Sequence, residues 1–390
     1  MSAASGSARG TVAVAAALAQ RPFVGGHTWF VLQYLLGLRA LGWDIVLIDR
    51  LELEMCHDAR GARCDPERSV NVDYVAHVMS SFGLDDAWTV LVPGGESIGM
   101  PRRDVERRIE ESAVLLNVMG YLDDAELLGR APLRAFLDID PGFGQMWSSL
   151  GLHDLFVGHD RFVTVGLNVG RPGCAVPDCG LDWVATLPPV ALDHWPVADG
   201  GEAFTTVASW RGPFGPVEYG GRTYGLRVHE FRRFIDLPHA TGAPFAIALD
   251  IDSTDGADID RLGDSGWTLL DPRNEARDPT AYRGFIQRSG AELTVAKNMY
   301  VDTRSGWFSD RSACYLASGK PVLAQDTGFA SALPAGEGLL AFETFEDAVA
   351  GVEEIAADRA RHGRVAREIA EEHLASDRVL GRLLAALGVA

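Results

Sequence analysis

His27 is the histidine in this sequence best placed to accept a proton. It follows a glycine pair, Gly25 and Gly26. An imidazole with a pKa near ~6.5 can take a proton from a hydroxyl group at neutral pH, and a carboxylate on its other nitrogen would fix the tautomer. Asp138 and Asp140 end a later strand-like run and could supply that carboxylate. Alternatively, His27 only caps a helix or binds a phosphate through neutral hydrogen bonds.

Three basic side chains, Arg211, Arg227 and Lys297, lie close to strand-like runs and could neutralise a bound polyanion. Fixed cations favour a reaction in which negative charge builds up on a leaving group. Lysine occurs only at positions 297 and 320 among 35 basic residues. Because the chain otherwise uses arginine, we expect that position 297 requires a compact ammonium group. Codon bias explains the same rarity, and surface salt bridges are the alternative role for the arginines.

The loop from residue 305 to residue 310 has the composition of an anion site. Its first two residues form a turn, and Ser309 is placed to cap the helix that follows. Unpaired N–H groups between Ser305 and Arg311 are expected to point outward, and the helix dipole adds about half a positive charge. The candidate binding residues of this loop are Ser305, Gly306, Trp307, Phe308, Ser309 and Asp310.

Alternating strand and helix patterns position these residues. The 39 residues from Ala291 to Phe329 contain a strand, a loop, a helix and a second strand, which is one βαβ unit of a parallel sheet. The strand-like run Thr11–Ala17, a helix at 28–41 and a strand at 43–49 form another such unit. In such units the loops after the strands and the amino ends of the helices face the ligand crevice.

The segment Phe308–Gly328 resembles the nucleotide-sugar segment of GT-B glycosyltransferases. In that family a Phe-Gly turn, a helix ending Ala-x-Gly-x-Pro-Val and a strand ending Asp-x-Gly hold the sugar donor. The matching residues are Phe308, Ala317, Gly319, Pro321, Val322, Asp326 and Gly328. Gly306 and Cys314 stand where the family usually has glutamates. Asp310 lies one helical turn before Cys314 and is expected to take over a hydroxyl contact.

The resemblance implies an α/β fold with two facing, doubly wound Rossmann-like domains and a cleft between them. The chain of 390 residues exceeds the size of one hydrophobic core, which agrees with two domains. We predict an acceptor-binding domain over residues 1–200, with Gly25 and Gly26 in its acceptor-side loop. A nucleotide-sugar domain is expected over 201–371, and a C-terminal helix at about 372–390 is expected to pack back on the first domain.

The predicted reaction is metal-independent transfer of a sugar from a nucleoside-diphosphate sugar to a small-molecule acceptor such as a secondary metabolite. No cofactor is expected beyond the nucleotide sugar as co-substrate. A histidine base on the acceptor side predicts inversion at the anomeric carbon. The alternatives are a nucleotide-sugar epimerase or hydrolase of the same fold, or a non-catalytic nucleotide-sugar binding protein. The sequence does not identify the sugar, the base or the acceptor.

The net charge of −19 and the lack of a basic run exclude nucleic acid and anionic membranes as expected partners. No apolar run reaches the ~18 residues of a membrane span, and no secretion signal is recognised at the amino end, so a cytoplasmic location is expected. Five cysteines, including Cys174 and Cys179, are expected to be reduced thiols. The oligomeric state is open, with a homodimer as one option.

Other chemistries fit the sequence less well. The glycines at 25 and 26 do not form the Gly-x-Gly-x-x-Gly motif of dinucleotide-binding dehydrogenases, and neither a Walker loop nor a Gly-x-Ser-x-Gly nucleophile turn is present. Asp-x-Asp pairs, which hold metals in the other large glycosyltransferase fold, occur at 138–140 and 250–252. The continuous match over 308–328 outweighs that metal-site interpretation, so no metal is expected.

Overall fold

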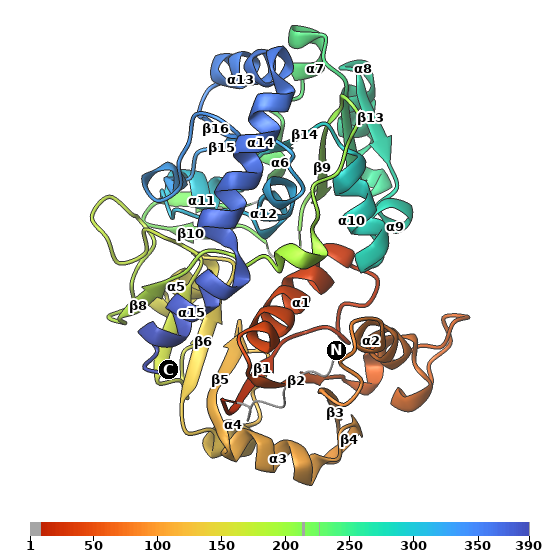
Figure 1. The fold of residues 1–390 in the computed structure, drawn as a ribbon, viewed down its shortest axis with the longest axis vertical. Coiled ribbons are helices and arrows are strands. Elements are labelled where there is room, and N and C mark those ends of the chain that lie inside the picture. The colour runs from red at the N-terminus through yellow and green to blue at the C-terminus, as the bar shows by residue number, and fades with distance from the viewer. Residues whose placement is uncertain (1–8, 213–214, 226, 390) are drawn as a thin grey trace, which may run out of the picture. The chain divides into compact units, whose positions relative to one another are not determined.

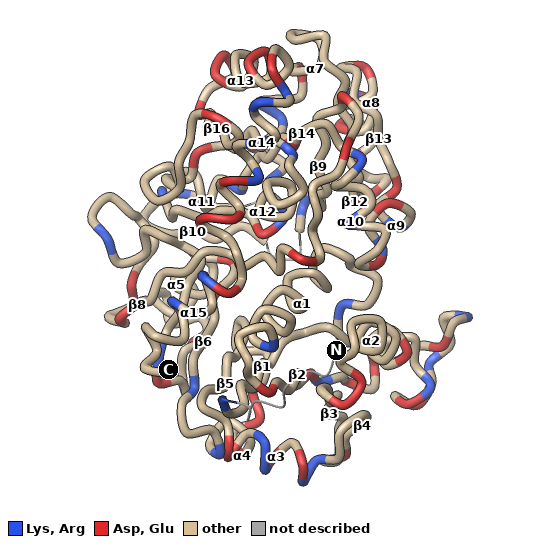
Figure 2. Tube along the Cα trace, viewed as in Figure 1, with Lys and Arg blue, Asp and Glu red and all other residues tan. Residues whose placement is uncertain are grey.

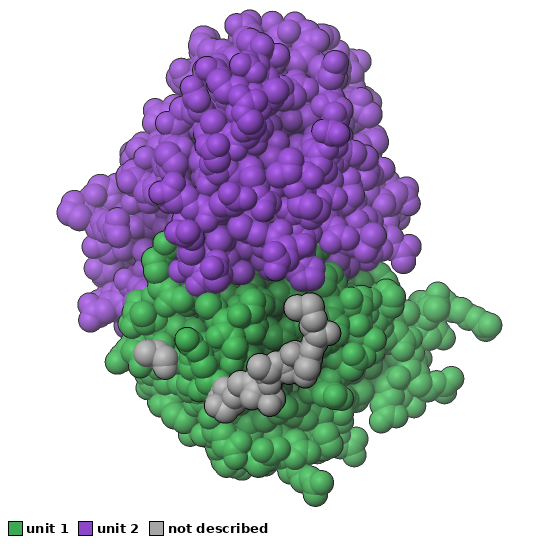
Figure 3. Space-filling model, viewed as in Figure 1, with its two compact units in different colours: residues 1–139, 155–163, 380–390 green, residues 140–154, 164–379 purple. Residues whose placement is uncertain are grey.

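The structure is a computed structural model that describes residues 9–212, 215–225 and 227–389. The chain forms two compact units, coloured separately in Figure 3. Unit 1 comprises Met1–Ile139, Leu155–Val163 and Leu380–Ala390, and unit 2 comprises Asp140–Asp154 and Thr164–Val379. These ranges differ from the predicted domains because residues 140–154 and 164–200 fall in unit 2. The division into domains at residue 200 stays a prediction.

The first sheet has the strand order β4-β3-β2-β1-β5-β6-β7-β8. Its strands are β1 (Thr11–Ala15), β2 (Asp44–Arg50), β3 (Trp88–Val92), β4 (Glu96–Gly99), β5 (Ser112–Val118), β6 (Arg134–Asp138), β7 (Arg161–Thr164) and β8 (Trp183–Ala185). β1 pairs in parallel with β2 and β5, and β4 pairs antiparallel with β3. The small apolar residues of β1 are buried on both faces, as expected for a central parallel strand.

Helices flank the strands of unit 1 (Figure 1). They are α1 (Gly25–Ala40), α2 (Val70–Ser81), α3 (Arg102–Glu110) and α4 (Ala125–Arg130), with short 3₁₀ turns at Leu53–Met55 and Pro66–Arg68. The prediction that Gly25 and Gly26 form a loop is wrong, because α1 begins at Gly25 and contains both glycines and His27 in its first turn. The chain bends before them, where Phe23 has φ 63°, and the hydroxyl of Thr28 donates to the carbonyl of Val24 (3.1 Å).

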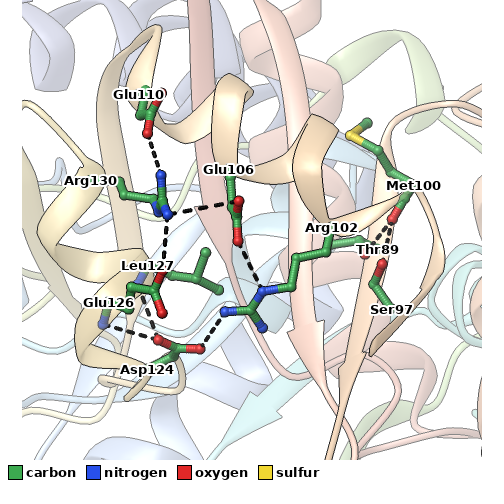
Figure 4. Close-up of polar contacts among 10 residues, drawn as sticks. All are labelled: Thr89, Ser97, Met100, Arg102, Glu106, Glu110, Asp124, Glu126, Leu127 and Arg130. Carbon is green, nitrogen blue, oxygen red and sulfur yellow. Dashed lines mark hydrogen bonds and ion pairs between the residues drawn. The ribbon is translucent and has the colours of Figure 1, made fainter. Parts of the chain in front are cut away.

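Charged residues on α3 and α4 form an ion-pair network at the surface (Figure 4). Arg102 lies between Glu106 (3.0 Å) and Asp124 (3.1 Å), and Arg130 contacts Glu106 at 3.8 Å. Asp124 also caps α4 by accepting from two backbone N–H groups. Partly exposed pairs of this kind are screened by solvent and contribute little to stability. The charge of α3 is therefore that of a solvated helix face rather than of a binding patch.

Unit 2 is built on a second sheet with the order β13-β12-β9-β14-β15-β16. Its strands are β9 (Phe204–Ser209), β12 (Phe245–Asp250), β13 (Trp267–Leu270), β14 (Ala291–Thr294), β15 (Val322–Gln325) and β16 (Leu339–Phe342). Neighbouring strands in this order pair in parallel. Unit 2 also contains a two-stranded antiparallel hairpin, β10 (Val217–Tyr219) and β11 (Arg222–Tyr224).

The helices associated with unit 2 complete the α/β arrangement (Figure 1). They are α5 (Phe143–Ser149), α6 (Arg227–Phe231), α7 (Leu237–Thr241), α8 (Gly256–Asp264), α9 (Pro272–Glu275), α10 (Pro279–Arg288), α11 (Asn298–Asp302), α12 (Asp310–Ala317), α13 (Phe345–Ala357) and α14 (Arg359–Ile369). The last helix, α15 (Ser376–Ala386), begins in unit 2 and continues into unit 1, which includes Leu380–Ala390. Short 3₁₀ turns lie at Leu192–His194, Ser253–Asp255 and Phe329–Ser331, and a π turn lies at Ala370–Leu374. Apolar side chains bury the sheet, with Phe204 stacked on Phe245 (5.3 Å).

The βαβ unit predicted at 291–329 is confirmed. β14 and β15 pair in parallel, and α12 lies between them in sequence. Ser309 caps α12 as predicted, because its side chain accepts from the N–H of Arg311. A five-residue helix, α11, was not predicted in the connecting loop. Since β9, β14 and β15 are parallel neighbours, their carboxyl ends meet at one edge of the sheet.

Candidate functional site

Lys297 lies three residues after β14, at the carboxyl edge of the unit 2 sheet. Its ammonium contacts both carboxylate oxygens of Asp140 (2.8 and 3.0 Å), and it lies over the rings of Phe143 (5.0 Å) and Tyr300 (5.2 Å). The hydroxyl of Tyr300 also donates to Asp140. The ammonium is therefore held in one place by a carboxylate and two aromatic faces. Asp140, predicted as a partner of His27, is instead paired with Lys297.

Arg227 begins α6 and is the second basic group of this region. Burial and the nearby Arg311 together lower the pKa of Arg227 to about 10, although Tyr300 and Asp140 oppose this. Its Nε is buried and has no hydrogen-bond partner among the described residues. A buried donor without a partner costs about 1–3 kcal/mol. An added anion could remove this cost and satisfy the guanidinium.

Arg311, near the start of α12, is a third cation that the sequence analysis did not select. It donates to Glu292 (2.6 Å), to the hydroxyl of Thr294 (3.1 Å) and to the carbonyl of Val207 (3.0 Å). The adjacent Glu292 holds the pKa of Arg311 well above its usual range, although burial opposes this. One sequence signal existed, because Glu292 is a charged residue inside a short buried strand, and such a charge needs a buried partner.

We call these residues the carboxyl-edge site. It consists of Asp140, Arg227, Lys297, Tyr300 and Arg311. Three cations face two carboxylates, because Lys297 pairs with Asp140 and Arg311 with Glu292, so the excess positive charge is that of Arg227. A region with excess positive charge and one buried unpartnered N–H is suited to an anion with several oxygens, such as a diphosphate.

The backbone of the loop at 305–309 is hydrogen-bonded to other parts of unit 2. The N–H of Ser305 donates to Tyr300 (3.1 Å) and that of Gly306 to Thr327 (2.8 Å). The prediction of outward-pointing N–H groups is therefore wrong at both positions, and also at Arg311, whose N–H bonds the Ser309 side chain. The carbonyl of Tyr300 in α11, the carbonyl of Thr327 after β15 and the side chain of Ser309 accept from these groups, which the sequence alone did not show.

The side chains of this loop support the carboxyl-edge site from beneath. Trp307 stacks on Tyr300 with ring centroids 4.4 Å apart, and Phe308 packs against Phe329 (5.4 Å). The side-chain amide of Asn168 donates to the carbonyls of Arg304 (3.0 Å) and Gly328 (3.2 Å). Through these contacts the loop fixes the ring that holds Asp140.

Gly306→Ala is expected to destabilise the protein by at least about 1–2 kcal/mol, the usual cost of a left-handed backbone for a residue with a Cβ. Gly306 has φ 76°, and its Cβ would lie 2.9 Å from the backbone nitrogen of Asn168. Gly242→Ala is the matched control, because Gly242 has φ 67° and nothing within 4 Å of that position. Denaturant unfolding should show a larger loss for Gly306→Ala. Equal losses would mean that the loop yields to the methyl group.

Arg211 follows β9 but is paired with Asp255 by two hydrogen bonds, one of them 2.9 Å long. The Asp255 side chain is only 5% exposed. We expect Arg211→Ala to lower the melting temperature, because Asp255 would lose its partner, and to change nucleotide affinity little. The control is Arg273→Ala, whose partner Asp271 is more exposed. A large loss of nucleotide affinity with an unchanged melting temperature would instead support the predicted binding role of Arg211.

His27 is partly buried in the first turn of α1 in unit 1. Its Nε2 lies 2.5 Å from the carbonyl of Ala17, and since a carbonyl only accepts, Nε2 carries the proton and Nδ1 is the free acceptor. Burial and the nearby Arg21 together lower the pKa of His27 to about 4, although the hydrogen bond to Ala17 opposes this. The backbone therefore fixes the tautomer that a carboxylate was predicted to fix. The base role of His27 stays a prediction.

The remaining candidates occupy separate places. Asp138 is buried at the end of β6 in unit 1, whereas Asp140 belongs to unit 2. Asp310 is the first residue of α12, and burial raises its pKa although Arg311 opposes this. The structure thus groups Asp140, Arg227 and Lys297, and it adds Tyr300 and Arg311. Arg211 is not grouped with them, because among the described residues it pairs with Asp255 instead.

The described residues contain no cluster of three or more metal-ligating side chains. No helix in the described part of the chain is long and apolar enough to cross a membrane.

Comparison with known proteins gives matches only at the level of structure. No family model matches the sequence, and no curated protein matches it. An alpha-glucosyltransferase solved with UDP and a 13-mer DNA containing an HMU base aligns over 97% of this chain and 99% of its own, with TM-score 0.60 and 11% identity. Sucrose-phosphate synthase from Thermosynechococcus elongatus aligns over 97% of this chain and 99% of its own (TM-score 0.55, 12% identity). AviGT4, a glycosyltransferase involved in avilamycin A biosynthesis, aligns over 97% of each chain (TM-score 0.52, 13% identity).

The chain has the GT-B fold. The resemblance inferred from residues 308–328 is confirmed at the level of the fold, with an α/β arrangement of two parallel-rich sheets. Identities of 11–13% do not carry substrates or residue roles from those proteins to this GT-B chain.

The exclusion of a nucleic-acid partner is wrong. A protein of the same fold has been solved with DNA, so net charge alone does not exclude DNA as a partner of an acidic GT-B chain. Net charge averages over the whole surface, and Figure 2 shows Lys and Arg interspersed with Asp and Glu along the trace. Binding depends on the local distribution of charge rather than on the total.

Proposed function

We propose that this protein is a glycosyltransferase that takes a nucleoside-diphosphate sugar in unit 2. The observation that carries the proposal is the carboxyl-edge site, where the buried, unpartnered Nε of Arg227 lies in the same electrostatic environment as Arg311 and Asp140. Proteins of the same fold solved with UDP support a nucleotide sugar as the ligand. The position at the carboxyl ends of parallel strands also supports it.

In the proposed reaction an acceptor oxygen forms a bond to the anomeric carbon while the bond from that carbon to the diphosphate oxygen breaks. The acceptor proton passes to a base, for which His27 is the candidate. The electron pair of the broken bond remains on the diphosphate, so its negative charge increases. Arg227 and Lys297 stabilise that charge, and the ammonium retains at least one N–H beyond its two contacts with Asp140.

Proteins of the same fold support two classes of acceptor. The similarity to AviGT4 supports a small molecule of natural-product type, and the similarity to the alpha-glucosyltransferase supports a DNA base. The proposed transfer needs no metal, because protein cations supply the charge that a metal would otherwise supply.

The test is a nucleotide-release assay with UDP-glucose and related nucleotide sugars. Each donor is incubated with polyhydroxylated small molecules or with DNA containing HMU, in the presence and absence of EDTA. Acceptor-dependent release that survives EDTA supports transfer. Release without an acceptor supports the hydrolase alternative, conversion of the sugar without release supports the epimerase, and binding without turnover leaves a non-catalytic binding protein.

A further inference from the structure

A cavity of about 520 Å³ lies in unit 2 at the amino ends of the strands. Its walls include Gly201, Gly290 and Lys320, which precede β9, β14 and β15 by one to three residues. We call it the amino-edge cavity. The carboxyl-edge site lies at the other ends of these strands, which at about 3.3 Å per residue are roughly 13–20 Å long. The two sites are therefore separate.

The amino-edge cavity is rich in positive charge. Four basic side chains and two carboxylates line it: Lys320, Arg359, Arg364, Arg367, Asp199 and Glu368. Arg367 is paired with Glu371 (2.7 Å). Lys320, Arg359 and Arg364 have no carboxylate within 4 Å among the described residues. Three unpaired cations in one cavity are unusual in a chain with a net charge of −19.

The burial of Lys320 and Arg359 is not offset by their neutral partners alone, whereas Arg364 is exposed and donates to the carbonyl of Ala360 (3.2 Å). Lys320 donates to the carbonyl of Ala198 (2.5 Å), and Arg359 donates to that of Gly201 (3.3 Å). The Nε of Arg359 is buried without a hydrogen-bond partner among the described residues. Burial lowers the pKa of Lys320 and that of Arg359. The nearby charge of Arg359 also lowers the pKa of Lys320. Asp199 and Glu202 oppose these shifts without forming ion pairs.

Glycines allow the walls to approach the basic groups. A Cβ at Gly290 would lie 2.8 Å from Nη1 of Arg359 and 2.6 Å from the carbonyl oxygen of Gly201. A Cβ at Gly363 would lie 2.8 Å from the carbonyl oxygen of Gly319. Larger residues would fill the space next to the guanidinium. The cavity is thus kept open beside Arg359, and the first turn of α14 adds its own positive dipole end there.

We propose that the amino-edge cavity binds a small phosphorylated anion, distinct from the nucleotide sugar. A phosphate would pair with Lys320, Arg359 and Arg364 and supply an acceptor for the unpartnered Nε. The volume exceeds what a phosphate alone needs and lies in the range of small-ligand pockets. The exposed Val197 offers an apolar contact for the carbon part of a phosphate monoester.

The test is calorimetric titration of the whole chain with inorganic phosphate and, separately, with glycerol 3-phosphate, against sodium chloride at matched ionic strength. We expect saturable binding of phosphate that Arg359→Ala and Arg364→Ala each weaken about tenfold or more. Arg378→Ala, an exposed arginine outside the cavity, should leave the affinity unchanged. Tighter binding of glycerol 3-phosphate would identify a phosphate monoester as the ligand, and equal affinity would identify free phosphate.

A further variant separates this inference from the proposed function. Arg227→Ala disables the carboxyl-edge site, so phosphate binding in the amino-edge cavity should survive it. Loss of phosphate binding in Arg227→Ala but not in Arg364→Ala would place the anion at the carboxyl edge and overturn the inference. A lack of saturable binding by folded wild-type protein would overturn it as well. Arg359→Lys, which keeps the charge, serves where Arg359→Ala does not fold.

Discussion

His27→Ala is expected to lower kcat by about 10²-fold, with the affinity for the nucleotide sugar nearly unchanged. General-base catalysis contributes about 10²- to 10⁴-fold. The lower end applies here, because a pKa of about 4 makes the imidazole a weaker base than one titrating near neutral pH. The proposed nucleotide-sugar site belongs to unit 2 and His27 to unit 1. Steady-state turnover and calorimetric affinity, measured on the same variant, check both statements.

The pH dependence gives a second readout for His27. Its ring is unprotonated from pH 5 to 8, so the acid limb of kcat/KM that belongs to His27 should lie near pH 4 rather than near 6.5. The unfolded chain binds this proton below about pH 6.5. Stability is therefore lost as the pH falls from about 6.5 towards 4, and His27→Ala should reduce that loss. His77→Ala, an exposed histidine of α2, is the control. Wild-type turnover in His27→Ala would remove the base assignment.

Arg227→Ala is expected to weaken nucleoside-diphosphate binding by about 10- to 150-fold, the equivalent of 1.5–3 kcal/mol for a charge-assisted hydrogen bond. The reason is that its Nε lacks a partner in the ligand-free protein, so the guanidinium gains bonds from the ligand without losing any at that nitrogen. The variant also removes a buried charge near Arg311. We therefore expect the free energy of unfolding of Arg227→Ala to fall by less than the free energy of nucleoside-diphosphate binding.

Calorimetric titration with UDP is the measurement for Arg227. Arg222→Ala provides the control, because Arg222 is exposed on β11. Arg227→Lys should recover part of the affinity, since it restores the charge but not the guanidinium geometry. An unchanged affinity in Arg227→Ala would show that the diphosphate does not bind at the carboxyl edge.

The periodic parts of the fold could be read from the sequence. The strands predicted at 11–17 and 43–49 and the cap at Ser309 follow local rules, because alternation, small apolar runs and helix caps involve residues close in sequence. The start of α1 was misplaced because glycine is a poor helix residue in isolation. Here Gly25 and Gly26 lie in the first turn of α1, so their low helix propensity affects only the start of the helix.

The contacts that build the candidate site could not be read in the same way. Lys297 and Arg227 were selected from their positions near strand ends, but the pairing of Lys297 with Asp140 joins residues 157 positions apart. Arg311 was missed because its partner Glu292 lies on a neighbouring strand, 19 positions away. Arg211 lies at the end of a strand as expected, but its guanidinium is hydrogen-bonded to Asp255. Strand position predicts the edge of a sheet, whereas ion pairing depends on tertiary neighbours.

Reagents that modify lysine side chains have only two targets in this sequence, Lys297 and Lys320. Lys297 lies in the carboxyl-edge site with 16% of its side chain exposed, and Lys320 lies in the amino-edge cavity and is 4% exposed. Thirty-three arginines carry the remaining basic charge, and they do not react with acylating or reductive-methylation reagents under mild conditions. Isotope-labelled methyl groups on the two amines would therefore give two side-chain signals, one for each anion site.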